Sequence, residues 1–248
     1  MDTQIKNKSA KITYANGGMV QTVDLYSREG LDLISLLWTK LYAQYKLHYE
    51  TKWMGIPIIQ FTEDILMMQE LIWKIKPDVI IECGIAHGGS LIFYASLFEL
   101  MGQGKVIGVD IDIREHNRIA IENHPMKHRI ELLEGSSTSD EIVAALKERI
   151  AGAKTVLIVL DSNHSAAHVA KEIELFHDMV TPGSYLVVMD GAQAYVADIP
   201  DAKPGWEQDN PLIAIEEFVA KNDRFEVDPY YNRLKVTSNP NGFLRRVK

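Results

Sequence analysis

Short runs of apolar, mostly β-branched residues alternate with helical patterns through the middle of the chain. The runs read DVIIEC, KVIGVD, RIELLE, TVLIVL and SYLVVM, and the helices predicted between them cover 90–100, 115–122, 140–150 and 164–179. Such alternation is typical of parallel βαβ units, and unbroken apolar runs indicate strands that are buried on both faces. The pattern therefore predicts an α/β fold built on a mostly parallel sheet.

The N-terminal part of the chain has a different pattern. The first residues, about 25 by this pattern, form a loosely held extension, and apolar side chains then recur at helical spacing from Leu31 to Tyr45. A second amphipathic helix is predicted over 61–75, and a Gly- and Pro-containing break over 53–59 separates the two. We assign 1–55 to an N-terminal extension with a helix and 56–248 to the main domain.

The C-terminal part adds one more helix and several short strand candidates. The helix is predicted over 211–220, and the strands over 225–227, 234–236 and 243–246. Strands that follow the last βα unit without long crossovers suit an antiparallel edge. We therefore expect the sheet to end in an antiparallel strand pair.

Composition narrows the choice of ligand and compartment. The 248-residue chain carries a formal net charge of −8, and its Lys and Arg do not gather into the basic face that nucleic-acid binding needs. Its one cysteine, Cys83, excludes an internal disulfide. No stretch approaches the roughly 18 apolar residues of a membrane span, and the N-terminus lacks a signal-peptide pattern. We expect a soluble, cytoplasmic protein that acts on a small molecule and has no nucleic-acid or membrane partner.

The first βα junction, from Glu82 to Ser90, is rich in glycine and directly follows a predicted strand. Glycines there let the backbone turn sharply and pass close to a ligand. The spacing differs from the dinucleotide fingerprint, and the carboxylate of Glu82 disfavours a pyrophosphate but favours a cofactor with an ammonium and a sulfonium. The candidate cofactor-binding residues of this junction are Glu82, Gly84, Ala86, His87, Gly88 and Ser90.

Two further junctions complete the predicted cofactor site. Asp110 ends the second strand and can accept both hydroxyls of a ribose, whereas the neighbouring Asp112 is interpreted as a helix N-cap. Ser136 and Ser137 follow the third strand and could receive an adenine edge. Together the three junctions favour an adenosyl cofactor without phosphates.

Two aspartates follow the fourth and fifth strands and mark the predicted catalytic end of the sheet. Ligands collect outside the carboxyl ends of parallel strands, so Asp161 and Asp190 should face the cofactor together. Two convergent carboxylates can hold a divalent cation such as Mg²⁺, which would lower the pKa of a substrate hydroxyl. The alternative is that each aspartate only caps the next helix. His164 is the candidate general base, with Asp161 as the second catalytic candidate, and His168 is interpreted as supporting or structural.

The segment between Gly191 and Asp209 shows no periodicity. Ordered loops of this length are uncommon unless they are functional, and this one follows the predicted catalytic strand. We interpret it as a substrate lid in which Tyr195 and Trp206 could stack on a sugar or an aromatic acceptor, although loop aromatics also pin loops to a core.

These motifs resemble the cephalosporin hydroxylase-like family of S-adenosylmethionine-dependent methyltransferases, which includes rhamnosyl and macrolide-sugar O-methyltransferases. The resemblance covers roughly Ile56 to Arg246, and its motifs are IECGIAHGGSLIFYAS, GVDIDIR, LLEGSS, LDSNHSAAHVAKEIELFHDMVTPGSYLVVMDG and TSNPNGFLRRV. It implies a Rossmann-like class I methyltransferase fold with a seven-stranded sheet and helices on both faces. It also implies an adenosyl cofactor, a divalent metal in several members, frequent oligomers and a saccharide or glycosylated acceptor.

One position departs from the acidic pair expected after the fifth strand, because this chain has Met189 before Asp190. A thioether is a poor ligand for Mg²⁺, so the site loses one oxygen donor unless Gln193, Asn163 or water replaces it. The sequence thus predicts an S-adenosylmethionine-dependent O-methyltransferase with a possible Mg²⁺. The alternatives are an adenosyl-binding protein without catalysis and an NAD-dependent dehydrogenase. The apolar N-terminal helices further predict a homo-oligomer.

Overall fold

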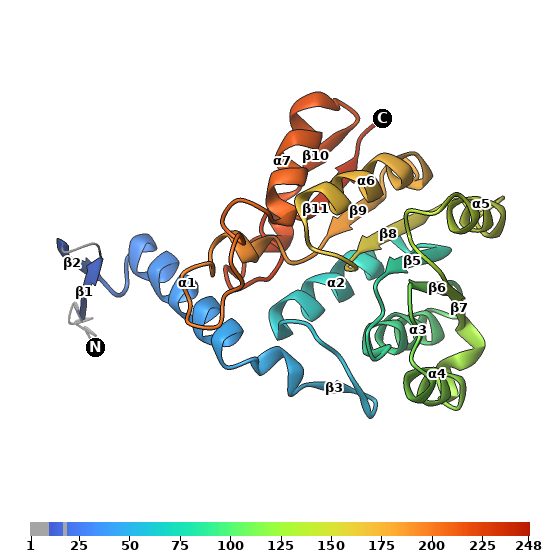
Figure 1. Cartoon of the computed structure of the whole chain (residues 1–248), viewed down its shortest axis with the longest axis horizontal. Coiled ribbons are helices and arrows are strands. Elements are labelled where there is room, and N and C mark those ends of the chain that lie inside the picture. The colour runs from blue at the N-terminus through green and yellow to red at the C-terminus, as the bar shows by residue number, and fades with distance from the viewer. Residues whose placement is uncertain (1–9, 17–18) are drawn as a thin grey trace, which may run out of the picture.

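A seven-stranded mixed sheet forms the centre of the molecule (Figure 1). The computed structural model describes residues 10–16 and 19–248. The strand order is β10-β11-β9-β8-β5-β6-β7. The five parallel strands are β5 (Val79–Cys83), β6 (Lys105–Asp110), β7 (Ile130–Glu134), β8 (Val156–Leu160) and β9 (Tyr185–Val188).

The last two strands form the antiparallel edge that the sequence predicted. β11 (Phe243–Arg246) pairs antiparallel with β9, and β10 (Phe225–Val227) pairs antiparallel with β11. The prediction of a strand over 234–236 is wrong, because this stretch is a turn in which Lys235 has φ +71°. A left-handed residue cannot continue a strand, so the apolar pattern was overridden by the turn.

Helices cover both faces of the sheet and close two apolar cores. On one face lie α2 (Thr62–Ile75), α3 (Gly89–Met101) and α4 (Glu115–Glu122), and on the other lie α5 (Asp140–Arg149), α6 (Ala166–Phe176) and α7 (Pro211–Lys221). Short 3₁₀ turns connect them at Leu47–Tyr49, Pro125–Arg129, His177–Met179, Gly191–Ala194 and Pro229–Asn232. Strands β5 and β8 are buried along their whole length, as two covered faces require.

The N-terminal part contains more structure than the loose extension that the sequence predicted. β1 (Lys11–Asn16) and β2 (Met19–Asp24) pair as an antiparallel hairpin, and α1 (Arg28–Gln44) follows. The Ser27 hydroxyl accepts the Gly30 N–H at 3.0 Å and caps α1. The break between α1 and α2 holds a small hairpin of β3 (Lys52–Trp53) and β4 (Ile56–Pro57). The proposed division of the chain at residue 55 stays a prediction.

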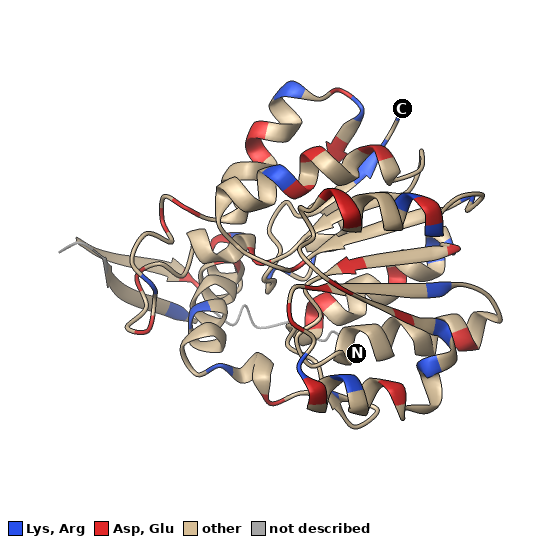
Figure 2. Cartoon of the chain, turned by 45° about the vertical axis from the view of Figure 1, so that its right-hand side comes forward, with Lys and Arg blue, Asp and Glu red and all other residues tan. Residues whose placement is uncertain are grey.

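The distribution of charge agrees with the sequence analysis. Figure 2 shows Lys and Arg interspersed with Asp and Glu over the outer helices, and the strands inside are largely uncharged. Among the described residues, no helix is long and apolar enough to cross a membrane. The carboxyl ends of β5 and β8 lie side by side where the chain order of the strands reverses, which is the place where parallel sheets bind ligands.

Candidate active site

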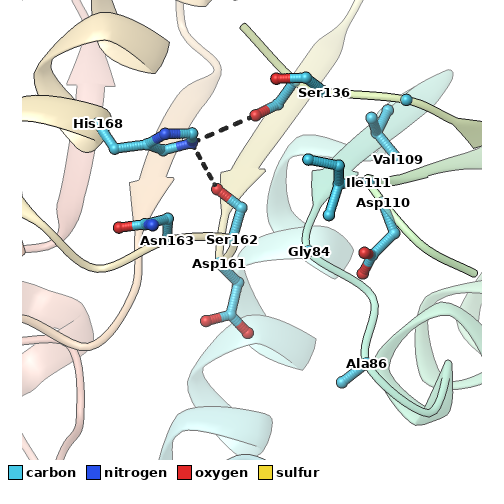
Figure 3. A pocket seen from close by; sticks show the side chains of 12 residues that line it. Gly84, Ala86, Val109, Asp110, Ile111, Ser136, Asp161, Ser162, Asn163 and His168 are labelled. Carbon is cyan, nitrogen blue, oxygen red and sulfur yellow. Dashed lines mark hydrogen bonds between the residues drawn. The ribbon is translucent and has the colours of Figure 1, made fainter.

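A cavity of about 380 Å³ opens at the carboxyl ends of β5, β6, β7 and β8 (Figure 3). Its walls hold six of the predicted cofactor-binding residues, namely Gly84, Ala86, Asp110, Ser136, Ser137 and Asp161. The sequence analysis did not assign the remaining lining residues to the cofactor; they are Val109, Ile111, Gly135, Ser162, Asn163 and His168. The three junctions that were expected to meet therefore do meet around one cavity.

Gly84 brings the first junction against the end of β8. Its φ is +87°, and a Cβ added there would lie 2.1 Å from the carbonyl oxygen of Asp161. The Asp161 N–H donates to the Cys83 carbonyl at 2.7 Å, which fixes the same contact. Because both the backbone angle and the close approach exclude a side chain, the sheet edge requires glycine at this position.

Glu82 lies below the cavity and does not line it. Its side chain is completely buried and accepts hydrogen bonds from Ser90 Oγ at 2.6 Å and Tyr94 OH at 3.2 Å. Burial raises the pKa of Glu82 to about 8, so the neutral acid predominates at neutral pH. In this arrangement Glu82 and Ser90 connect β5 to α3, and their assignment to the cofactor stays a prediction.

Two other residues of the first junction also stay outside the cavity lining. The His87 ring approaches Asn117, with Nδ1 3.2 Å from Oδ1, and Asn117 Nδ2 donates to the Ala86 carbonyl at 2.9 Å. Gly88 has φ +85° and precedes the first residue of α3. Both residues shape the turn that presents Ala86, so their assignment as cofactor ligands stays a prediction.

The carboxylate of Asp110 is held at the opposite wall by backbone donors. Oδ2 accepts the Ile85 N–H at 2.9 Å, and Oδ1 accepts the Asp112 N–H at 3.2 Å. The expected role of Asp112 as a helix N-cap is wrong, because Arg114 occupies the position before α4. Each carboxylate oxygen of Asp110 keeps a second lone pair that can accept a hydrogen bond from a hydroxyl of a bound ligand.

His168 lines the cavity, which the sequence did not indicate. It sits in the first turn of α6, and Nε2 is 3.2 Å from Ser162 Oγ and 3.5 Å from Ser137 Oγ (Figure 3). Ser162 Oγ also donates to the buried Glu172 at 2.6 Å. The position of His168 one helical turn beyond the fourth junction was the only sequence signal for this placement.

Asp161, His164 and Asp190 form an acid–base cluster beside the cavity. Their potential ligand atoms lie within 4.8 Å of one another. His164 Nε2 is 3.5 Å from Asp161 Oδ1, and Nδ1 is 3.1 Å from Asp190 Oδ2 and 2.8 Å from Gln193 Nε2. The expected helical placement of His164 is wrong, since α6 begins at Ala166 and His164 belongs to the preceding loop. The loop conformation is what lets one imidazole reach both carboxylates.

The electrostatics of this cluster favour a charged imidazole in the absence of ligand. Burial on its own lowers the pKa of His164, but Asp190 and then Asp161 outweigh it and raise that pKa to about 9. Burial raises the pKa of Asp161 to about 6 despite its contact with His164. A second positive charge entering the cavity would repel the imidazolium and favour the neutral ring.

Asp190 is held in an unusual backbone conformation. Its φ is +60°, in the left-handed region that few residues other than Gly, Asn and Asp adopt. Its N–H donates to Asn239 Oδ1 at 3.0 Å, so the C-terminal segment before β11 fixes this conformation. The preceding Met189 is 2% exposed and packs in the core, away from the carboxylates.

A second cavity of about 520 Å³ adjoins the first and shares Ala86, Asp161 and Ser162 with it. Its other walls come from α1 and the 3₁₀ turn after it, from the residues just before α2 and from the segment after β9. The residues that complete its lining are Thr39, Ala43, Lys46, His48, Tyr49, Ile59, Gln60, Phe61, His164, Asp190, Ala192, Gln193, Val196, Ile199, Asp201, Lys203, Trp206 and Ser238. Trp206 thus faces this cavity as the lid interpretation expected, whereas Tyr195 lines a separate hollow beside α1.

The comparisons with known proteins identify the family. The family model described as "Rhamnosyl O-methyltransferase/CmcI" matches residues 45–247. The chain belongs to this family. A rhamnosyl O-methyltransferase of Mycobacterium tuberculosis is 30% identical over 220 residues, which are 86% of this chain and 80% of the relative. That of Mycobacterium leprae is 33% identical over 144 residues, or 56% and 60% of the two chains.

Solved structures share the fold of this family member. The apo structure of CmcI has a TM-score of 0.58 at 20% identity and covers 81% of this chain and 77% of its own. The MycE methyltransferase in complex with Mg, SAH and mycinamycin VI has a TM-score of 0.51 at 18% identity and covers 95% and 66%. The Rossmann-like methyltransferase fold and the resemblance stated from the sequence are therefore confirmed, and with them the expected reaction class, S-adenosylmethionine-dependent O-methyl transfer.

Proposed function

We propose that this chain transfers the methyl group of S-adenosylmethionine to a hydroxyl of a saccharide or a glycosylated small molecule. The observation that carries the proposal is the meeting of two cavities at Asp161, with the acid–base cluster at their junction. One cavity has the size and polar groups for the adenosyl cofactor, and the other has room for an acceptor ring. The rhamnosyl and mycinamycin names of similar proteins support a sugar-bearing acceptor.

The cofactor would lie along the sheet edge. Asp110 would accept the ribose hydroxyls, Ser136 and Ser137 would face the adenine, and the backbone from Gly84 to Ala86 would run beside the amino-acid end. Ala86 and Asp161 border both cavities, which places the sulfonium methyl near their junction. Holding the methyl group and a hydroxyl in line supplies most of the rate enhancement in such a transfer.

His164 is the group we assign to proton removal. The acceptor oxygen forms a bond to the methyl carbon as the sulfur–carbon bond breaks, and the hydroxyl proton passes to the imidazole. Asp190 and Asp161 orient the ring and stabilise the imidazolium that results. The cationic cofactor helps to prepare the base, because its charge favours the neutral form of His164 before transfer.

The residues present also fit a divalent cation in part. Asp161 and Asp190 supply two carboxylates, and His164 supplies a nitrogen within the same 4.8 Å cluster, whereas Met189 is turned into the core. A bound Mg²⁺ would polarise the acceptor hydroxyl. With two protein oxygen donors the ion would keep several waters, so we expect weak binding.

Methyl transfer from S-adenosylmethionine to a panel of deoxyhexosides and glycosylated macrolides tests the proposal. We expect S-adenosylhomocysteine but not NADH to bind in calorimetry, and turnover with at least one glycoside. Asp161→Asn and His164→Gln should each reduce kcat by about 10²-fold or more, as loss of a general base does. Lys171→Ala serves as the control, because Lys171 is exposed on α6 and lines neither cavity. Turnover in EDTA distinguishes the two mechanisms: loss of turnover, restored by Mg²⁺, would indicate metal assistance, and unchanged turnover would indicate base catalysis alone. Binding without turnover on any hydroxylated acceptor would instead indicate a non-catalytic binder.

A further inference from the structure

Helix α1 presents its apolar side chains to solvent and its small or polar ones to the body. Ser35, Thr39 and Tyr42 are buried, at 6%, 5% and 6% exposure. The exposed apolar side chains of the outer face are Leu31 (52%), Ile34 (42%), Leu37 (40%), Trp38 (43%), Leu41 (46%) and Tyr45 (70%). Leu36 (38%) instead borders the hollow that Tyr195 lines. This polarity is the reverse of that of a helix whose only partner is its own domain.

The exposed residues follow the spacing of a helix–helix contact. Leu31, Ile34, Trp38, Leu41 and Tyr45, here called the α1 seam, are separated by three and four residues alternately. This is the a/d spacing of a heptad, in which each apolar side chain packs into a hole on a facing helix. The seam is therefore shaped for another helix.

The charges around the seam favour an identical partner. Only two charged residues lie between Leu31 and Tyr45, and both are paired within the chain: Asp32 with Lys235 at 2.9 Å, and Lys40 with Asp198 at 2.5 Å. A face without free charge can meet a copy of itself without like-charge repulsion, whereas a partner of opposite charge would find nothing to attract it.

The exposed area is also large enough for a dimer contact. The six apolar side chains of α1 expose on the order of 600 Å² together, which reaches the upper end for a monomer surface and approaches the roughly 800 Å² per partner of a stable interface. The adjoining β1–β2 hairpin exposes Met19 (65%) and Val20 (73%) and pairs with no third strand among the described residues. Figure 1 shows this hairpin and α1 at one end of the molecule, away from the sheet. Because a two-stranded hairpin is marginal alone, it too needs a partner.

We propose that two copies of this chain form a dimer in which their α1 seams pair antiparallel about a two-fold axis near Trp38. Trp38 is the middle residue of the seam, so in an antiparallel pair it meets its own copy, while Leu31 of each copy meets Tyr45 of the other. Antiparallel pairing also aligns the two helix dipoles favourably. An isologous contact of this kind closes on itself and does not propagate.

The dimer contact also bears on acceptor binding, a consequence that rests on the proposed function. Thr39 and Ala43, on the opposite side of α1, line the acceptor cavity, and Lys40 holds the segment after β9 through Asp198. Pairing through the seam would thus fix one wall of that cavity. A chain with a disrupted seam is expected to show a raised KM for the acceptor and unchanged binding of S-adenosylhomocysteine.

Light scattering after size exclusion measures the assembly directly. We expect the full chain to have a mass of at least twice 28.0 kDa, and Ile34→Glu/Leu41→Glu to have a mass of 28.0 kDa with an unchanged far-UV spectrum. Leu100→Glu is the matched control, since Leu100 is 84% exposed on α3 and should leave the mass of the assembly unchanged. A wild-type mass of 28.0 kDa up to 100 μM, or a double variant that keeps the wild-type mass, would overturn the proposal.

Crosslinking tests the axis without introducing charge. Cys83 is fully buried, so an introduced cysteine provides the one accessible thiol among the described residues. We expect Trp38→Cys to form a disulfide-linked dimer on mild oxidation, and Leu100→Cys to remain a monomer on a non-reducing gel. Equal crosslinking of the two variants would refute pairing at the seam. Neither experiment uses methyl transfer, so their outcome is independent of whether the proposed function is correct.

Discussion

Replacing Asp64 with alanine should weaken both the fold and methyl transfer, although Asp64 lines neither cavity. Asp64 lies in the first turn of α2 and is 1% exposed. Its carboxylate accepts hydrogen bonds from Thr237 Oγ1 at 2.5 Å, from the Ser238 N–H at 2.7 Å and from Ser238 Oγ at 3.0 Å. Ser238 Oγ is also 2.8 Å from Asn239 Oδ1, the atom that accepts the Asp190 N–H. Asp64 therefore positions Asp190 through the C-terminal segment.

The loss in the free energy of unfolding expected for Asp64→Ala depends on which hydrogen-bond donors lose their acceptor. The backbone N–H of Ser238 is left buried without a partner, which costs about 1–3 kcal/mol, and the two hydroxyls lose about 1 kcal/mol each even if they turn to other acceptors. Burial raises the pKa of Asp64 to about 7, so removing this carboxyl also relieves part of the cost of burying it. A net loss of about 3 kcal/mol corresponds to a Tm lower by about 6–12 °C in a chain of this size.

Three measurements check this expectation. Thermal unfolding gives the change in Tm, and calorimetry with S-adenosylhomocysteine gives cofactor affinity. Initial rates with a glycoside that the wild-type chain methylates give kcat and KM. For Asp64→Ala we expect a lower Tm, a lower kcat and unchanged cofactor affinity. Glu63→Ala is the control, because the neighbouring Glu63 only accepts a hydrogen bond from the exposed Thr62. If Asp64→Ala kept both the wild-type Tm and the wild-type kcat, the relay to Asp190 would be wrong.

Two further predictions concern the cavity walls. Asp110→Ala should weaken S-adenosylhomocysteine binding by about 10-fold or more, since two ribose hydroxyls lose an ionised acceptor; unchanged affinity in calorimetry would contradict the ribose assignment. The kcat/KM for S-adenosylmethionine should rise with pH and level off above about 9, because this ratio reports on the free enzyme, in which the pKa of His164 is raised to about 9 and only the neutral ring acts as a base. Since that value exceeds the ordinary 6.5, the imidazolium stabilises the fold fully below pH 6.5, and this stabilisation is lost as the pH rises through about 9. A rate profile that stays the same in His164→Gln would exclude His164 as the base.

The central sheet could be predicted because its strands are buried on both faces and therefore read as uninterrupted apolar runs. The same reasoning located Asp161 and Asp190, since residues that follow parallel strands meet at one edge whatever the details of packing. The N-terminal hairpin was missed, although the sequence Gly17-Gly18 between two β-prone runs is a recognised turn signal. Its strands are largely exposed, so no apolar run marked them.

The parts of the site that could not be predicted depend on contacts between distant segments. Glu82 occupies a junction position typical of a ligand-binding acid, and the local pattern did not reveal its burial against Ser90 and Tyr94 of α3. The link from Asp64 to Asn239 joins the start of α2 to the chain before β11, a separation that no local pattern reveals. His164 reaches two carboxylates only because its loop departs from the helix that its spacing to His168 predicted.

The two cavities differ in which parts of the chain build them. The cofactor cavity comes entirely from the ends of β5 to β8 and the residues that follow, whereas α1, the residues between α1 and α2 and the segment after β9 supply most of the acceptor cavity. Acceptor preference can thus change by exchange of surface segments while the methyl donor and the reacting geometry stay the same. Grafting 191–209 from a relative would then be a practical way to redirect this chain to a new glycoside.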